Sequence, residues 1–502
     1  MDSVDIKKLH ENPPYGIIAV LFIGGFVSFL NNTLLNIAIP TIMEEFSVAP
    51  SAVQWVTTGY MLINGILIPT SAFFIQRFTN RQVFLTAMSL FALGTGLALI
   101  APNFLIIVIA RMTQASGAAM MMPLLMNVML TAFPVEKRGT AMGFFGMVMF
   151  MAPAIGPPLS GWVIEQYSWR ALFMIILPFA IITILFAVFK LKNITPQRHV
   201  KLDTISLILS SAGFGSLLYG FSSAGERGWA VIDVYGTIII GSIALILFIV
   251  RQIWLEDPML DFEVYKFPMF ALASVISVVL SVSMFSGMIL TPLYVQTVRE
   301  ISPFYSGLLM LPGAIVMGIM SPITGRLFDR YGARGISLFG LAITVTTTFL
   351  LSRLTLEMGY FHLMTLYTVR MFGISLVMMP IMTNGLNQLP MRLNPHGTAM
   401  NGTLQQVSGA IGSAVLLTIM TKRTETVMME QMANIESIAG MSEKQLMDVA
   451  MLNGINFSFF ISTLIALLAF ILTLFVKRVT PPPIPKMDDV DPDYDIEPAP
   501  SE

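Results

Sequence analysis

Cysteine is absent from this chain of 502 residues, so the sequence holds neither a disulfide framework nor a thiolate metal site. Charge is also scarce. Only 11% of the residues are Asp, Glu, Lys or Arg, whereas about a quarter would be usual in a soluble protein. The hydrophobic share is 55% and the mean hydropathy is +0.77. These values exclude an ordinary soluble domain and indicate a polytopic membrane protein with many lipid-facing helices.

Side chains that carry enzyme chemistry are few. No paired histidines, metal-ligand cluster, nucleotide-binding loop or serine nucleophile motif is recognisable, and no Asp or Glu lies well inside an apolar run. Three acidic residues lie near the ends of such runs: Glu165, Asp203 and Glu357. The four histidines are scattered, and we expect them at the surface or in loops: His10, His199, His362 and His396. We therefore expect no enzyme, cofactor, metal site, nucleic-acid partner or ATP-driven pump.

About fourteen apolar runs are long enough to span a bilayer. They cover approximately residues 16–42, 51–74, 82–101, 104–132, 140–164, 169–191, 203–222, 233–253, 269–294, 304–325, 335–353, 360–384, 397–420 and 455–477. An even number places both termini on one side of the membrane. With both termini in the cytoplasm, about nineteen of the 28 Lys and Arg residues fall inside, about seven outside and two within the membrane, which fits the positive-inside rule.

One charged stretch, Gly325 to Arg334, lies between two long apolar runs and reads Gly-Arg-Leu-Phe-Asp-Arg-Tyr-Gly-Ala-Arg. Because such a stretch is costly in lipid, we expect a cytoplasmic loop. Asp329 and Arg330 are expected to brace the ends of the flanking helices, and Gly325 and Gly332 to allow close backbone approach and a tight turn. The stretch resembles the loop signature Gly-x-Leu-x-Asp-Arg-x-Gly-x-Arg of the major facilitator superfamily. The resemblance implies an all-α membrane fold in which two six-helix bundles rock around a central cavity.

The chain also repeats itself. Gly139-Thr140-Ala141-Met142 recurs as Gly397-Thr398-Ala399-Met400, each after a short basic loop. The preceding apolar stretches contain Arg111-Met112 and Arg370-Met371, and each goes on to a Met-Met-Pro. Since these matches occur in the same order, they indicate two copies of a six-helix unit. The extra pair of apolar runs is then an insertion between the copies.

The first copy carries a degraded form of the charged motif over residues 72–82. Gln76 stands where the pattern has Asp, and Thr79 where it has Gly. We therefore expect an asymmetric latch between the two halves, with only the second-half motif intact.

These boundaries give a domain plan for the chain. It comprises a cytoplasmic N-terminus (1–14), an N-terminal six-helix bundle (15–195), two inserted helices (196–262), a C-terminal six-helix bundle (263–478) and a disordered acidic cytoplasmic tail (479–502). Within the second bundle, we expect residues 421–452 to form a polar extracellular loop. This loop either includes a surface helix or is a plain connector.

The fifth apolar run contains Ala152-Pro153-Ala154-Ile155-Gly156-Pro157-Pro158-Leu159-Ser160-Gly161. Small residues allow close helix packing, and prolines interrupt the backbone hydrogen bonds. The run resembles the Gly-Pro-x-x-Gly-Gly motif of superfamily antiporters at Gly156, Pro157 and Gly161, with Ser160 in place of a glycine. Close packing without a transport role is the alternative for any single glycine.

The first apolar run reads Leu30-Asn31-Asn32-Thr33-Leu34-Leu35-Asn36-Ile37-Ala38-Ile39-Pro40. It resembles the first-helix signature of the fourteen-spanner drug:proton antiporters, Leu-Asp-x-Thr-Ile-Val-Asn-Val-Ala-Leu-Pro. Asn31 occupies the acidic position of that signature, and an amide carries no proton near neutral pH. Direct proton coupling at Asn31 is therefore not expected, although Asn31 and Asn32 remain candidate cavity residues.

Arg111 and Arg370 are the clearly intramembrane charges, and buried arginines are costly and usually functional. The Arg111 segment, which includes Gln114, resembles the fourth-helix signature Arg-x-x-Gln-Gly-x-Gly. Arg111 either tunes a proton-binding group or binds an anionic substrate group, or it holds packing by donating to carbonyls of the first helix. Arg370 is its repeat partner. Gln405 is the candidate cavity residue of the thirteenth run, where polar side chains are expected to face the bundle interior.

Together these features predict a plasma-membrane exporter of amphipathic drugs or other toxic small molecules. The resemblance implies that protons are the coupling ion and that the protein works as a monomer in the lipid bilayer. An importer or facilitator of an organic anion or lipid-like metabolite in the same fold is the alternative. The glycine–proline run of the fifth helix disfavours that alternative, because the resemblance ties this motif to antiport.

Overall fold

The computed structural model describes residues 10–35, 38–48, 50–53, 55–195, 197, 200, 202–433 and 443–479. Every element in these residues is a helix. Fourteen of the described helices are long and apolar enough to cross a membrane. The predicted acidic tail lies outside the described residues from residue 480 onward, as do residues 1–9 of the predicted N-terminus.

The first half of the chain supplies six spanning helices: α2 (Tyr15–Leu34), α5 (Trp55–Arg77), α6 (Asn80–Leu99), α7 (Phe104–Ala132), α8 (Val135–Gln166) and α9 (Arg170–Lys190). Two short helices, α3 (Ile39–Phe46) and α4 (Pro50–Val53), lie between α2 and α5. The second half supplies α12 (Pro268–Leu293), α13 (Pro303–Tyr331), α14 (Ala333–Leu351), α15 (Tyr360–Ser375), α16 (Met378–Leu386), α17 (Asn394–Ala433) and α19 (Glu443–Thr473). Of these, α15 and α16 together make one span, Tyr360–Leu386.

Local sequence signals set several helix starts. The Thr79 side chain accepts from the Gln82 N–H and Gln82 accepts from the Thr79 N–H, so a capping box begins α6. Asn103 caps α7 by accepting from the Ile106 N–H. Pro268 and Pro303 occupy the first turns of α12 and α13, where a missing N–H has no consequence.

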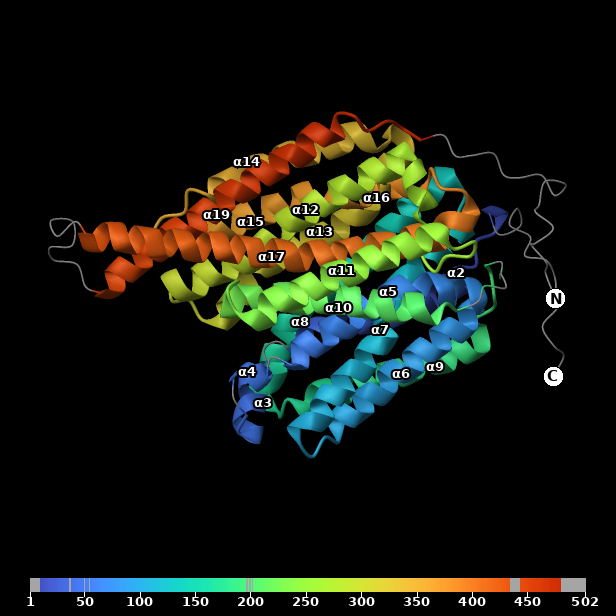
Figure 1. Ribbon diagram of the computed structural model, residues 1–502, viewed down its shortest axis with the longest axis horizontal. Coiled ribbons are helices and arrows are strands. Elements are labelled where there is room, and N and C mark those ends of the chain that lie inside the picture. The colour runs from blue at the N-terminus through green and yellow to red at the C-terminus, as the bar shows by residue number, and fades with distance from the viewer. Residues whose placement is uncertain are drawn as a thin grey trace.

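The two halves lie next to each other in Figure 1, with the blue to teal helices below and the yellow to red helices above. The most extensive contact between them is that of α8 along α13, and α5 packs against α17 on the other side; α7 also contacts α17, and α16 contacts α8. The beginning of α2 and the end of α19 lie at the end of the bundle that contains Asp329. His10 contacts the Thr131 carbonyl there, and Arg478 donates to the Asp329 carbonyl. We call this end of the molecule the Asp329 end.

The stretch from Gly325 to Arg334 is not the loop that the sequence predicts. α13 continues to Tyr331 and α14 begins at Ala333, so Gly332 alone separates the two helices. Gly332 has φ +80°, a conformation that L side chains rarely adopt, and this permits the sharp corner. The apolar residues end at the expected membrane boundary, but the helix α13 continues beyond that boundary.

Other helix ends differ from prediction for the same reason. The first spanning helix ends at Leu34, and α3 forms a separate helix, whereas the sequence predicts one run over 16–42. α17 continues to Ala433 and α19 begins at Glu443, so residues 421–433 and 443–452 extend the spanning helices and do not form a loop. In Figure 1 the orange end of α17 projects beyond the neighbouring helices.

Two helices between the halves, α10 (Thr204–Arg227) and α11 (Ile232–Trp254), form an antiparallel pair. α10 packs against both α5 of the first half and α17 of the second half. On the α5 side, the rings of Trp55 and Tyr219 stack with centroids 6.0 Å apart. On the α17 side, Trp229 just after α10 donates to Thr418 at 2.6 Å. The pair therefore bridges the two halves along one of their contacts.

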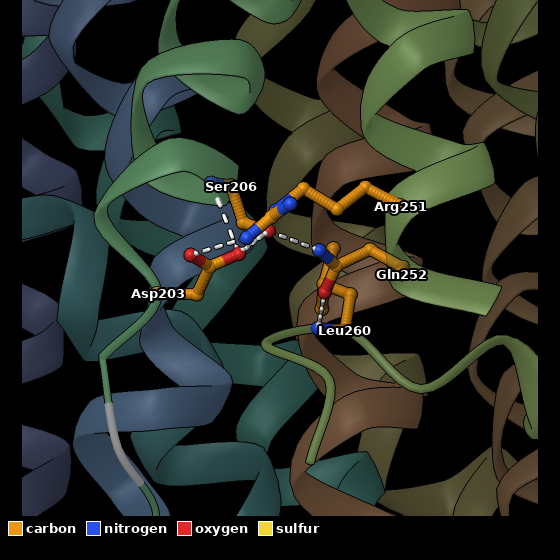
Figure 2. A network of polar contacts seen from close by, with 5 residues as sticks. All are labelled: Asp203, Ser206, Arg251, Gln252 and Leu260. Carbon is orange, nitrogen blue, oxygen red and sulfur yellow. Dashed lines mark hydrogen bonds and ion pairs between the residues drawn. The ribbon is translucent and has the colours of Figure 1, made fainter. Parts of the chain in front are cut away.

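A polar network fixes the base of this pair (Figure 2). Arg251 donates to both carboxylate oxygens of Asp203, from Nε at 2.6 Å and from Nη2 at 3.0 Å. Ser206 also donates to Asp203, and Gln252 joins Ser206 to the Leu260 N–H. The hydrogen bonds from Arg251 hold the pKa of the Asp203 carboxyl far below its usual range, against a smaller opposing effect of burial. Asp203 is therefore charged at neutral pH and poorly suited to carry protons.

Candidate functional site

At the Asp329 end, the carboxylate of Asp329 reaches across from α13 to α8. Oδ1 accepts from the Gly139 N–H at 2.8 Å, and Oδ2 accepts from the Thr140 N–H at 2.8 Å and the Thr140 hydroxyl at 2.6 Å. A charged acceptor in a water-poor contact makes hydrogen bonds of the stronger kind. The predicted latch residue therefore bonds directly to the first copy of the Gly-Thr-Ala-Met repeat.

Glycines allow α8 and α13 to approach closely beside this carboxylate. A Cβ atom on Gly143 would lie 2.5 Å from the Ser321 carbonyl oxygen, and one on Gly318 would lie 2.1 Å from Met151 Cγ. Towards the opposite end the fit loosens, because a Cβ atom on Gly161 would lie 3.7 Å from Phe304 Cδ2. The two helices are therefore in closest contact near Asp329.

The charged residues around Asp329 face outward. Arg330 and Arg334 are exposed, and the Arg330 guanidinium lies 5.2 Å from the centre of the Tyr331 ring. Arg478 donates to the main-chain oxygens of Asp329 and Arg330 at 2.9 and 3.3 Å, so the end of the chain after α19 covers the corner.

The other contact between the halves has a different chemistry. Gln76, at the degraded motif position on α5, lies with its Nε2 3.0 Å from Nε2 of His396 at the start of α17. His396 immediately precedes Gly397 and Thr398, the second copy of the repeat. The predicted asymmetry is thus visible. On one side the Asp329 carboxylate binds main-chain N–H groups, and on the other the Gln76 side-chain amide contacts the His396 imidazole.

His396 is a residue whose environment the sequence analysis misjudged. Its side chain is 5% exposed and is not at the surface, because α5 and the segment before α12 close over it. The short interval between Pro395 and Gly397 resembles a loop, and nothing local indicates burial. The repeat itself offered a signal. Because Gly139 and Thr140 bind Asp329, their counterparts Gly397 and Thr398 are expected opposite Gln76, and His396 directly precedes them.

The glycine–proline run of α8 contacts two helices. A Cβ atom on Gly156 would lie 2.1 Å from Thr33 Oγ1 of α2, and Ser160 donates to the Leu34 carbonyl at 2.5 Å. The Pro153 carbonyl accepts from Thr33 at 3.1 Å. On the opposite side, Pro157 and Gly161 face α13, near Gly307 and Phe304. α8 is therefore in contact with α2 of its own half and α13 of the other half.

Arg111 is completely buried within the first half. Its Nη1 donates to Gln114 Oε1 at 3.0 Å, and its Nε donates to the Val56 carbonyl at 3.4 Å. The guanidinium also lies 4.2 Å from the centre of the Tyr60 ring. The carbonyl partner belongs to α5, so the expectation of a partner on the first helix is wrong. Arg111 Nη2 has no hydrogen-bond partner among the described residues.

Arg370 forms the corresponding cluster in the second half. Nε donates to Thr348 at 3.0 Å, and Nη2 donates to the Ser283 carbonyl and to Ser286 Oγ. Ser286 in turn shares a hydrogen bond of 2.7 Å with Ser462 of α19. A Cβ atom on Gly287 would lie 2.1 Å from Arg370 Nη1, so the guanidinium packs directly against the α12 backbone.

The other candidate cavity residues are not joined to these arginines by any contact described for the chain. Asn31 is 1% exposed, and its Nδ2 lacks a hydrogen-bond partner among the described residues. Asn32 is exposed, and Gln405 is partly exposed on α17. The structure therefore brings Arg111 and Gln114 together but places Arg370 in a separate cluster in the other half.

A family model described as Major Facilitator Superfamily matches residues 21–413. The chain belongs to the major facilitator superfamily. It is a multi-pass membrane transporter, and transporters of this superfamily lie in the plasma membrane. The expected all-α major facilitator fold with fourteen spanning helices is confirmed.

Relatives within the superfamily cover nearly the whole chain. The lincomycin resistance protein LmrB of Listeria monocytogenes is 42% identical over 93% of this chain and 97% of its own length. A multidrug resistance protein B homolog of Mycobacterium tuberculosis is 30% identical over 80% of this chain and 75% of its own length. In fold, the chain resembles the crystal structure of the human organic anion transporter MFSD10, with a TM-score of 0.64 at 13% identity, over 92% of this chain and 99% of that one.

Proposed function

We propose that this superfamily transporter exports amphipathic drugs or other toxic small molecules by proton antiport with alternating access. The observation that carries the proposal is the Asp329 contact with Gly139 and Thr140, which closes one end of the bundle across the two halves. Such a contact must break and re-form if the halves rock around a central site. We place the Asp329 end in the cytoplasm, together with both termini, because the loops there carry most of the positive charge.

Two further observations support the proposal. Relatives at 42% and 30% identity are named for lincomycin resistance and multidrug resistance. The glycine–proline run of α8 packs between α2 and α13, where bending of α8 would change both contacts together. We propose that the substrate is a small amphipathic molecule and that the protein works as a monomer in the bilayer.

The chemistry of the described spans bears on what is carried. Asp and Glu are absent from the middle of each described spanning helix, whereas Arg111 and Arg370 are fully buried. One nitrogen of each guanidinium lacks a hydrogen-bond partner among the described residues. Neutral or anionic amphiphiles therefore fit better than dications. This observation also supports the second candidate, import or facilitated passage of an organic anion.

Substrate-driven proton movement in proteoliposomes distinguishes these functions. The purified full-length protein would be reconstituted with a pH-sensitive dye inside, and lincomycin, a neutral amphiphile, an anionic amphiphile and a dication would be added outside in turn. Proton flux driven by a substrate gradient is the expected result. Substrate movement without proton flux would instead indicate a facilitator or another coupling ion. Preferential transport of dications would contradict the preference for neutral and anionic substrates.

A further inference from the structure

The segment that follows α19 crosses the Asp329 end of the second half. We call residues 476–479 the C-terminal strap. Val476 is 3% exposed, and the Lys477 N–H donates to Met269 Sδ of α12 at 3.4 Å. Arg478 reaches the end of α13, and the main chain on either side of it is bound by α16. The strap therefore joins three helices of the second half: α12, α13 and α16.

Asn384 of α16 holds the strap by its main chain. Its Nδ2 donates to the Lys477 carbonyl at 3.0 Å, and its Oδ1 accepts from the Val479 N–H at 3.4 Å. A carbonyl can only accept and an N–H can only donate, so these two partners fix the orientation of the amide. Asn384 is 3% exposed, which shelters both hydrogen bonds from water. Because the two bonded residues flank Arg478, they also fix the point from which its side chain starts.

The guanidinium of Arg478 caps the C-terminus of α13. The last four carbonyls of a helix have no partner within the helix. Here the Phe328 carbonyl accepts from the Gly332 N–H at 2.8 Å. The next two carbonyls, of Asp329 and Arg330, accept from Arg478 at 2.9 and 3.3 Å. A cation at this position also complements the helix dipole, so Arg478 stabilises the last turn of α13.

This last turn is the one that carries the latch carboxylate. Asp329 is bonded on two sides: its main-chain carbonyl to Arg478, and its side chain to Gly139 and Thr140 of α8. The direction of a side chain follows from the helical main chain that carries it. If the last turn of α13 unwound, the carboxylate would therefore turn away from α8.

We propose that Arg478 is a positioning residue for the Asp329 latch: the strap keeps the last turn of α13 helical and so determines how firmly this end of the transporter closes. The inference rests on the alternating access proposed above and deepens it by naming a residue that controls the closed state. The strap contacts described here lie within the second half, so they can persist when the halves separate. They favour closure because a preorganised Asp329 avoids the cost of ordering the turn each time the latch re-forms.

The absence of cysteine allows a direct test with a single reporter thiol. Ser321 of α13 is fully buried, and a Cβ atom on Gly143 of α8 would lie 2.5 Å from its carbonyl oxygen. A thiol in the variant Ser321→Cys is therefore covered by α8 while the Asp329 end is closed. Its rate of alkylation by the neutral reagent N-ethylmaleimide, in purified full-length protein in lipid nanodiscs, reports how often α8 and α13 separate.

Arg478→Ala should raise this alkylation rate about twofold to fivefold, which is the range for loss of a cation at the C-terminus of a helix. Lys477→Ala is the matched control. It removes the same charge from the neighbouring residue of the strap, whose side chain is exposed and has no hydrogen bond among the described residues. We expect the parent rate for Lys477→Ala. Equal rates for Arg478→Ala and Lys477→Ala would overturn the proposal.

Two further variants test how the strap is held and which of its features acts. Asn384→Ala frees the main chain of the strap, so we expect a rise in the same direction as for Arg478→Ala. Arg478→Lys keeps a cation that can donate to one carbonyl, and its rate should fall between those of the parent and Arg478→Ala. A lysine variant that reacts as fast as the alanine variant, together with a parent rate for Asn384→Ala, would contradict the assignment.

A double-variant comparison shows whether Arg478 acts through Asp329. Asp329→Asn should itself raise the alkylation rate, because it removes the carboxylate that closes this end. In that background Arg478→Ala should add little, since residues that act in one chain of contacts are not additive. The full effect of Arg478→Ala in the Asp329→Asn background would exclude a positioning role, and a parent rate for Asp329→Asn would remove the latch and this inference with it.

A second reporter separates the latch from general loosening of the second half. Ser458 of α19 is fully buried and donates to the Leu416 carbonyl of α17 at 3.0 Å. The alkylation rate of Ser458→Cys should be the same with and without Arg478→Ala. If both reporters react faster in Arg478→Ala, the strap stabilises the second half as a whole, and the specific role of Arg478 at the latch is wrong.

The alkylation measurement needs no substrate, so it can fail independently of the exporter proposal. Lincomycin-driven proton flux would be recorded in parallel with the parent protein. Faster alkylation in Arg478→Ala without proton flux in the parent would keep the role of Arg478 and remove proton antiport. Proton flux together with equal alkylation of Arg478→Ala and Lys477→Ala would do the reverse.

Discussion

Gly139 of α8 and Gly325 of α13 meet so closely that a Cβ atom on Gly325 would lie 2.1 Å from the Gly139 carbonyl oxygen. The obstruction is main chain, which cannot rotate away as a long side chain can. Gly325→Ala should therefore force the helices apart at the cost of about 1–3 kcal/mol, as overpacking typically does. We expect roughly tenfold slower export of lincomycin at similar amounts of protein in the membrane.

The matched control for this prediction is Gly335→Ala. Gly335 lies in α14 at the same end, and no atom would come within 4 Å of a Cβ atom there. Alanine in a helix is favoured over glycine by about 1 kcal/mol, so this variant should transport normally and melt no earlier. Equal losses in both variants would show that the contact between Gly139 and Gly325 is not the cause.

Replacing Asp329 with asparagine tests the latch itself. The carboxylate accepts three hydrogen bonds from Gly139 and Thr140, and an amide in its place would turn an NH2 group toward one of those donors. Hydrogen bonds to a charged group contribute about 1.5–3 kcal/mol each, so Asp329→Asn should lower export about tenfold or more. Membrane insertion should stay intact, as measured by the amount of protein in isolated membranes. Asp233→Asn, on the exposed first turn of α11, is the control. Normal export by Asp329→Asn would remove the latch interpretation.

Arg111 distinguishes a transport role from a packing role. Its guanidinium reaches Gln114 and the Val56 carbonyl at once while lying over Tyr60, an arrangement that needs a planar, forked cation. Arg111→Ala should abolish export, whereas Arg111→Lys, which keeps the charge, should retain a measurable part. Export in vesicles and thermal unfolding would be measured for both variants. Mild and equal effects on export would favour the packing role.

Arg251→Ala should weaken the base of the inserted pair in a pH-dependent way. The pKa of Asp203 is depressed by Arg251, so the stability from this pair is present above the unfolded pKa of about 3.9 and is lost as the pH falls through the lower folded value. We expect a lower melting temperature than for the parent at neutral pH, and a difference that shrinks only as the pH drops well below about 4. Arg353→Ala, an exposed arginine over the Phe349 ring, should change little. A difference that instead grows with acidification would contradict the assignment.

Much of the fold could be predicted because lipid imposes a simple rule on the sequence. Spanning helices need long apolar runs, and the number of runs agrees with the number of described spans. The same rule misplaces helix ends, since hydropathy reports the membrane boundary and a helix continues past it wherever its main chain stays bonded. Two helices continue past the predicted boundary in this way: α13 extends to Tyr331, and α17 extends to Ala433.

Side-chain environments could be predicted less well. The repeat matches Asp329 with Gln76 and Gly139 with Gly397, but the bond between Asp329 and Gly139 depends on how the two halves dock, which no local pattern encodes. His396 illustrates the same limit, because its burial comes from Gln76 and Asp261, respectively 320 and 135 residues away in sequence. For Arg111 the sequence indicated burial, but it did not indicate which neighbouring helix supplies the carbonyl partner. That partner is on α5 and not on the first helix.

The position of α10 against both α5 and α17 also affects how molecules dissolved in the bilayer reach the transporter. The inserted pair covers the boundary between α5 and α17 on the side that faces the lipid. Among the described helices, α16 contacts both α8 and α13, but neither helix of the inserted pair packs across that boundary. Hydrophobic compounds that partition into the membrane would therefore approach the transporter laterally from one preferred direction, and the lipids along α8 and α13 would be the first to compete with them.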